Sequence, residues 1–304
     1  MGVEGSYDIL LAAHLVPYFA LDSAGENPSL QENLNKLDYR QFSETLLVDT
    51  TGRTGEPLPE KQVYDREILD IEKGELEPED AETLVSQADK FYLIGGRPEI
   101  CMSNSYRSLI EASRTYDQDI EFDMLTPYCF TGPGEDTLED KLTDDEVDVE
   151  LLSGLLSSYD FEHTSLISNE KEVEVIDSYL RDIQRMYRAQ EILNREDYEA
   201  SFRTDSERFQ NYGSEQIHFN LDGIHLPSGN ITGVEHYSGV NNIFENLIEF
   251  DADYLLELRD PGRNFEAELS RESGVFNLRS REKSAELEEI RELLVEKARI
   301  PLQN

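Results

Sequence analysis

The chain has 304 residues, of which 66 are Asp or Glu and 27 are Lys or Arg, so its formal net charge is −39 and its pI is about 4.3. Such a surface repels phosphate backbones and anionic lipid, which argues against nucleic acid and membrane partners. No run of about 18 apolar residues occurs, so no membrane-spanning helix is predicted.

The first half of the chain alternates strand patterns with helix patterns. Strands are expected at Tyr7–Ala13, around Leu46–Val48, and at Val63–Ile71, Phe91–Ile94, Ile120–Leu125 and Thr164–Ile167. Helices are expected over Pro78–Ala88, Ser103–Ser113 and Val149–Tyr159, and the polar stretch Gly132–Glu146 is expected to be a surface loop. This alternation predicts a three-layer α/β domain over residues 1–168, a parallel sheet with helices on both faces.

The second half has a different pattern, which predicts a separate region of mixed helix and hairpin over residues 169–304. A buried helical stripe runs from Val173 to about Leu193, and an amphipathic helix covers Ser284–Arg299. Asp222-Gly223 between two apolar runs is a hairpin signal. Asn241–Phe250 is expected to be a short helix or strand, and Phe276–Leu278 a strand.

The acidic residues are spread along the whole chain, and only eight lysines occur. High acid, low lysine and modest apolar content resemble the composition of proteins from extreme halophiles, in which molar salt screens the self-repulsion. The alternative is an acidic partner-binding protein in ordinary salt. The segment Met1–Ser6 lacks the basic-then-apolar pattern of a signal peptide. An intracellular, cytoplasmic location in high salt is therefore expected, or a place in a larger particle assembled there.

The segment that points most clearly to chemistry surrounds Cys101. A predicted strand runs into Gly95-Gly96, followed by a tight polar turn, the cysteine and a helix. A thiol near a helix N-terminus experiences the backbone N–H groups and the helix dipole, which favour the thiolate that a cysteine nucleophile needs. The alternative is a small buried apolar side chain in a close-packed turn.

Three segments resemble the isochorismatase and nicotinamidase superfamily of cysteine hydrolases. They are the turn Gly95–Cys101, the stretch Leu10–Phe19 at the end of the first strand, and Lys73-Gly74. The resemblance covers roughly residues 5–168 and implies an Asp–Lys–Cys triad, in which aspartate takes the thiol proton and the thiolate attacks a carbonyl carbon. Carried over, Cys101 is the nucleophile and Lys73 the lysine.

Signature positions of the superfamily are changed in this chain. His14 occupies the aspartate position, Val16 the glutamine position, and Pro98-Glu99 the Thr-Asp before the cysteine. A histidine is able to act as base to a cysteine, so the candidate catalytic residues are Cys101, Lys73 and His14. These changes point to altered chemistry or a lost activity.

No cofactor and no metal are predicted. The sequence contains no phosphate-binding loop, no Gly-x-Gly-x-x-Gly and no Gly-x-Ser-x-Gly elbow. Asp49 is an isolated acid and does not make a metal site. Cys129, in Thr126-Pro127-Tyr128-Cys129, is expected to be structural. Two cysteines provide neither a disulfide framework nor a four-cysteine zinc site.

Two functions are consistent with the sequence. The first is a degenerate relative of the superfamily that serves as a structural or assembly subunit, in a homo-oligomer or a cellular or viral protein complex, with an interface built by residues 169–304. The alternative is a hydrolase that cleaves an amide or related bond of a small-molecule substrate through Cys101.

Overall fold

The computed structural model describes eleven segments of the chain, and two predicted elements, the hairpin at Asp222-Gly223 and the element at Asn241–Phe250, lie outside them. The described residues form two compact units, divided after Ser178 within helix α7 (Lys171–Arg195). The expected boundary between residues 168 and 169 stays a prediction. The described segments are 6–16, 20–21, 25–49, 57–58, 63–144, 149–196, 198–204, 254–260, 265–272, 275–280 and 285–302.

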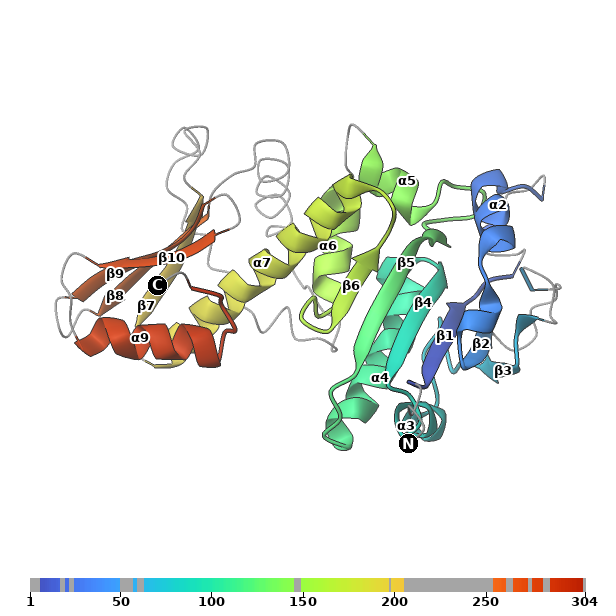
Figure 1. Ribbon diagram of the computed structural model, residues 1–304, viewed down its shortest axis with the longest axis horizontal. Coiled ribbons are helices and arrows are strands. Elements are labelled where there is room, and N and C mark those ends of the chain that lie inside the picture. Colours follow the sequence, from blue (N-terminus) through green and yellow to red (C-terminus); the bar gives the residue numbers. More distant parts are fainter. Residues whose placement is uncertain are drawn as a thin grey trace, which may run out of the picture. The chain divides into compact units, whose positions relative to one another are not determined.

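The first unit is built on a six-stranded sheet in the order β3-β2-β1-β4-β5-β6, in which every neighbouring pair is parallel (Figure 1). All six strands predicted from the sequence are present, and the predicted parallel α/β fold is confirmed. The strands are β1 (Asp8–Ala13), β2 (Glu44–Asp49), β3 (Arg66–Leu69), β4 (Lys90–Gly96), β5 (Glu121–Phe130) and β6 (Thr164–Ile167).

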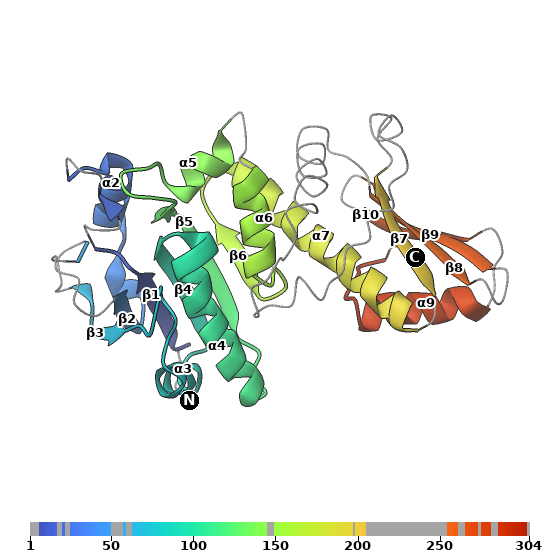
Figure 2. The ribbon, with the colours of Figure 1, turned by 180° about the vertical axis from the view of Figure 1, so that it is seen from behind.

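Helices cover both faces of this sheet, which is why β1 is apolar on both sides. On one face, Leu30 and Leu34 of α2 (Pro28–Lys36) belong to one buried cluster with Leu10. On the other face, Tyr106 of α4 (Ser103–Thr115) meets Phe122 edge to face, with ring centroids 4.7 Å apart. Figure 2 shows α4 in front of β4 and β5, with α3 (Pro78–Val85) beside it.

Two helices of this unit were not expected from the sequence. Asn27 caps α2 by accepting from the Leu30 N–H, and Pro28 occupies its first turn. Within the stretch predicted as a surface loop, residues Leu138–Thr143 form α5, so the loop prediction is wrong there. Thr137 and Asp140 make a reciprocal capping box, and Leu138 and Leu142 are buried. The predicted helix α6 (Val149–Ser158) is present.

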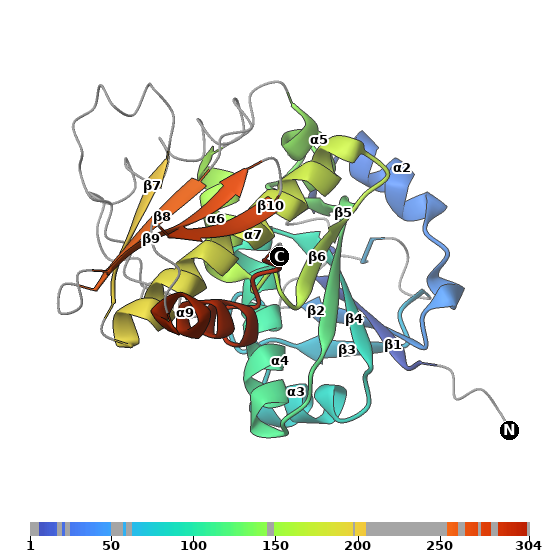
Figure 3. The same ribbon diagram turned by 60° about the vertical axis from the view of Figure 1, so that its left-hand side comes forward.

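The second unit contains a four-stranded antiparallel sheet in the order β10-β9-β8-β7 (Figure 3). Its strands are β7 (Glu199–Thr204), β8 (Tyr254–Asp260), β9 (Phe265–Glu272) and β10 (Val275–Ser280). Only β10 was predicted as a strand. The C-terminal helix is present as α9 (Ala285–Glu296), and its apolar stripe, Leu287, Ile290 and Leu294, is buried.

None of the helices in the described part of the chain combines the length and the apolar character needed to cross a membrane.

Candidate functional site

The candidate site lies at the carboxyl edge of the six-stranded sheet. The chain passes from β1 to β2 and β3 on one side, then returns to place β4 on the other side of β1, so the strand order reverses between β1 and β4. In open α/β sheets, ligands bind outside the carboxyl ends of the strands at such a switch point. His14 directly follows β1, and Cys101 lies in the turn after β4.

His14 is held rigidly at this edge. Its backbone has a positive φ of 51°, and its N–H donates to the carbonyl of Val48 at the end of β2. Its Nε2 lies 2.9 Å from Oδ2 of Asp70, and the two side chains are 1% and 0% exposed. The imidazole therefore sits beside a carboxylate in a place that excludes water.

The Asp70 carboxylate also organises the turn that follows β3. The same oxygen, Oδ2, accepts from the backbone N–H of Gly74 at 2.5 Å. Gly74 has a φ of 91°, and a Cβ placed there would lie 2.2 Å from the carbonyl oxygen of Cys101. Only glycine allows this close approach, so the Lys73-Gly74 turn packs directly on the backbone of the cysteine.

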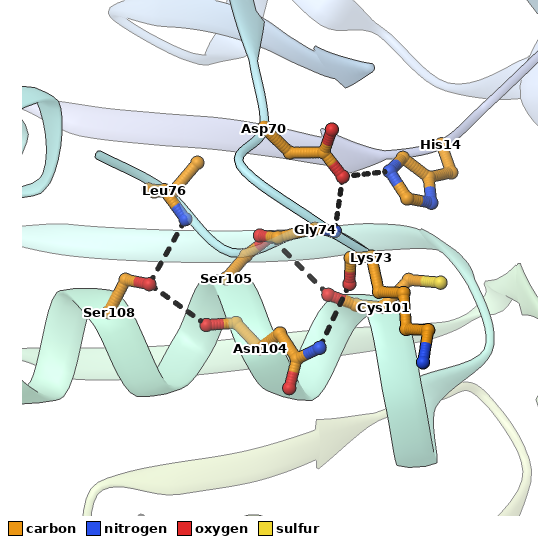
Figure 4. Close-up of polar contacts among 9 residues, drawn as sticks. All are labelled: His14, Asp70, Lys73, Gly74, Leu76, Cys101, Asn104, Ser105 and Ser108. Carbon is orange, nitrogen blue, oxygen red and sulfur yellow. Dashed lines mark hydrogen bonds and ion pairs between the residues drawn. The ribbon is translucent and has the colours of Figure 1, made fainter. Parts of the chain in front are cut away.

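Side chains from the first turns of α4 form hydrogen bonds with this turn, as Figure 4 shows. Asn104 Nδ2 donates to the carbonyl of Lys73 at 3.0 Å, and the Ser105 hydroxyl donates to the carbonyl of Gly74 at 2.6 Å. The Leu76 N–H donates to the Ser108 hydroxyl at 3.1 Å. The turn after β3 and the helix after Cys101 thus form one hydrogen-bonded body.

Cys101 lies in a short π-helical turn, η3 (Pro98–Met102), that runs directly into α4. The residue is 6% exposed. The strand before it approaches β1 closely, because a Cβ on Gly95, whose φ is 108°, would lie 2.2 Å from the carbonyl oxygen of Ala13. Arg97, with a φ of 44°, then redirects the chain into η3.

Lys73 contributes its backbone to the site more clearly than its amine. Its φ is 51° and its carbonyl is held by Asn104. Its side chain is 66% exposed, and its Nζ lies 3.6 Å from Oε1 of Glu72. The structure thus brings the three predicted residues, His14, Lys73 and Cys101, to one edge of the sheet, while their catalytic roles stay predictions.

Backbone strain is concentrated at this edge. Of the described non-glycine residues with positive φ, Asp117 and Arg299 follow the ends of α4 and α9, where a left-handed residue commonly closes a helix. The other three, His14, Lys73 and Arg97, lie in the turns around the site. Residues in such conformations cost free energy and cluster at functional sites.

Other residues considered in the sequence fall outside this network. Cys129 is fully buried, its Sγ lies 3.3 Å from the carbonyl oxygen of Leu125, and burial raises the pKa of its thiol. Asp49 is buried at the end of β2. Within the described segments, no group of three or more His, Cys, Asp or Glu residues is arranged to hold a metal ion.

Asp70 is the residue of this site that the sequence analysis missed. It follows β3 directly and, across the end of β2, reaches the histidine that follows β1. The predicted strand Val63–Ile71 contains this acid, whereas β3 ends at Leu69, so only a shorter predicted strand places Asp70 at the carboxyl edge of the sheet. The resemblance to the superfamily assigns the aspartate position to His14, so Asp70 has no role in the sequence-based prediction.

No protein-family model matches the chain, and the comparison with curated proteins finds no match. Solved structures do show similarity. An isochorismatase-like hydrolase from Alkaliphilus metalliredigens is 12% identical with a TM-score of 0.36, over 59% of this chain and 97% of that one. MAR1 ribonuclease from Caenorhabditis elegans is 13% identical with a TM-score of 0.32, over 58% of this chain and 92% of that one.

PnC1 from L. infantum, solved in complex with nicotinate, is 12% identical with a TM-score of 0.33, over 55% of this chain and 99% of that one. One of the three thus has the name of the superfamily that residues 5–168 resemble. With identities near 12% and TM-scores below 0.5, these likenesses do not determine a function, which has to come from the site itself.

Proposed function

We propose that the chain is a hydrolase with a cysteine nucleophile, acting on an amide or related carbonyl of a small molecule. The observation that supports this most directly is positional: His14 and Cys101 follow the two strands that border the switch point of the sheet. A base and a nucleophile at one edge are what such chemistry needs. The resemblance of residues 5–168 to cysteine hydrolases supports the same reaction type.

The proposed reaction has two stages. His14 takes the thiol proton of Cys101, the sulfur bonds to the carbonyl carbon, and the C–N bond breaks as the proton passes to the leaving amine. Water, deprotonated by the same imidazole, then attacks the thioester, releasing the carboxylic acid and restoring the thiol. Each stage uses only groups of this chain, the substrate and water.

A second candidate is a non-catalytic assembly subunit in a halophile. Two observations favour it: Cys101 is 6% exposed, and the Lys73 amine extends toward Glu72 at 66% exposure. In this candidate the left-handed turns serve packing, and residues 169–304 supply an interface to a second copy or to another protein. A chain that stays monomeric in high salt and retains no partner in a pull-down contradicts it.

Alkylation by iodoacetamide separates the two candidates. We expect Cys101 to be labelled at pH 7 at least about tenfold faster than a free thiol, and His14→Gln to slow it by at least about tenfold. Peptide mass spectrometry in high salt measures each cysteine separately, with buried Cys129 as the internal unreactive reference. Labelling of Cys101 no faster than that of Cys129 rules out the hydrolase.

A further inference from the structure

The sequence presents the superfamily's aspartate as lost, yet a buried carboxylate is present at the site and comes from a different strand. We propose that Asp70 is the positioning residue of this site: it orients the His14 imidazole and, through Gly74, holds the turn that packs on Cys101. This inference rests on the proposed function, because it assigns the group that makes His14 an effective base.

The first step of the argument concerns the proton on the imidazole. An ionised carboxylate accepts hydrogen bonds and donates none, so the contact of 2.9 Å between Nε2 and Asp70 Oδ2 places the ring proton on Nε2. The acceptor nitrogen of the neutral ring is then Nδ1, which becomes the atom that takes a proton. Because both side chains are buried, water does not compete for the bond that selects this tautomer.

The second step concerns charge. When His14 takes the thiol proton it becomes an imidazolium, and a carboxylate 2.9 Å away stabilises that cation. A thiolate beside an imidazolium is the reactive state of a cysteine–histidine pair. Asp70 thus supplies the negative charge that the superfamily's aspartate supplies in another way.

The third step concerns the nucleophile. The oxygen that accepts from His14 also accepts from the Gly74 N–H at 2.5 Å, and Gly74 packs on the carbonyl of Cys101. Ser105, one turn of helix beyond Cys101, donates to the Gly74 carbonyl. One carboxylate oxygen therefore links the base to the turn that positions the nucleophile, as Figure 4 shows.

The test replaces Asp70 by asparagine, which keeps the size and an acceptor oxygen but removes the charge. We expect Asp70→Asn to slow iodoacetamide labelling of Cys101 at pH 7 by at least about tenfold. The matched control is Asp65→Asn at the other end of β3, where the carboxylate accepts from the N–H and hydroxyl of Thr45 at 2.8 and 2.9 Å. We expect that control to change the labelling rate less than about twofold, since its carboxylate contacts no part of the site.

A second measurement does not depend on Asp70→Asn. Nitrogen-15 NMR of the wild-type histidines should show His14 protonated at Nε2 and bare at Nδ1, with the signal assigned by its absence in His14→Gln. A His14 ring protonated at Nδ1 overturns the proposal, whether or not Asp70→Asn folds.

The outcomes separate this inference from the proposed function. If wild-type Cys101 is labelled rapidly and Asp70→Asn is labelled at the same rate, the positioning role of Asp70 is overturned and the proposed hydrolase is not. Slow labelling of wild-type Cys101 overturns both. Equal slowing in Asp70→Asn and Asp65→Asn attributes the effect to general loosening of β3 and also overturns the positioning role.

Discussion

Each of the two units holds a buried pair of an acid and a base, and the two pairs lie in different kinds of place. In the first unit, His14 and Asp70 meet at the carboxyl edge of a parallel sheet, among three left-handed turns. In the second, Arg271 of β9 meets Asp182 of α7, with Nε 2.6 Å from Oδ2 and side chains 5% and 7% exposed. Burial and distance alone barely distinguish them.

Chemistry and position do distinguish them. Arginine stays charged in proteins and neither takes nor gives up a proton near neutral pH, whereas histidine does both. The Arg271 guanidinium also lies over the ring of Tyr179, 4.8 Å from its centroid, as part of a packed core. Only the first pair contains a histidine, and it lies at the sheet edge where Cys101 also lies, which is why the hydrolase is proposed there.

The largest expected effect comes from breaking the pair in the second unit. We expect Arg271→Leu to lower the free energy of unfolding by about 3–5 kcal/mol, because it leaves Asp182 buried without its closest cation. Denaturant unfolding in high salt measures this. Arg185→Leu is the matched control: Arg185 reaches the same carboxylate at 3.4 Å from a more exposed position, and we expect a loss below about 1 kcal/mol.

The same variant tests whether the two pairs differ in kind. Labelling of Cys101 in folded Arg271→Leu should match that of the wild type, because this pair belongs to the other unit. A drop in the labelling rate as large as that of Asp70→Asn would contradict the distinction, since it would mean that losing either buried ion pair lowers the reactivity of Cys101.

An intermediate effect is expected where β4 meets β1. Gly95→Ala should cost about 1–3 kcal/mol of unfolding free energy, because alanine is strained at a φ of 108° and its Cβ would press on the Ala13 carbonyl. It should also slow Cys101 labelling, since β4 leads into η3. Gly25→Ala is the matched control, with a φ of 81° and open space around the added Cβ. If Gly95→Ala labels at the wild-type rate, the backbone conformation at Gly95 does not affect the reactivity of Cys101.

The parallel sheet was predictable because its strands are continuous apolar runs bounded by turn residues, as in Tyr7–Ala13. Of the antiparallel sheet, only β10 is predicted from the sequence, although β9 shows the alternation expected of a half-buried strand. Its apolar residues Phe265, Ala267 and Leu269 are buried, while Glu266 and Glu268 between them are exposed. No element is predicted there from the sequence, because Glu266 and Glu268 interrupt the apolar residues.

The site was only partly predictable, for a physical reason. His14 and Cys101 follow strands that are neighbours in the sheet, and each is recognisable from the end of an apolar run. The partnership of Asp70 with His14 depends on the strand order β3-β2-β1, because the two residues follow strands separated by a third. A linear sequence shows which residues end strands but not which of those ends lie within reach of each other.

The smallest expected effect concerns Lys73, and it decides how far this site resembles the Asp–Lys–Cys triad. Lys73→Gly removes a left-handed non-glycine residue and should raise the free energy of unfolding by up to about 1 kcal/mol, whereas Lys73→Gln keeps the strain and should change it by less than about 0.5 kcal/mol. Both variants remove the amine. Because that amine is exposed and faces Glu72, we expect iodoacetamide to label Cys101 at the wild-type rate in both. Equal slowing in both variants would show that the ammonium stabilises the thiolate after all, and would make the site a lysine-assisted one in which Asp70 and His14 replace a single aspartate.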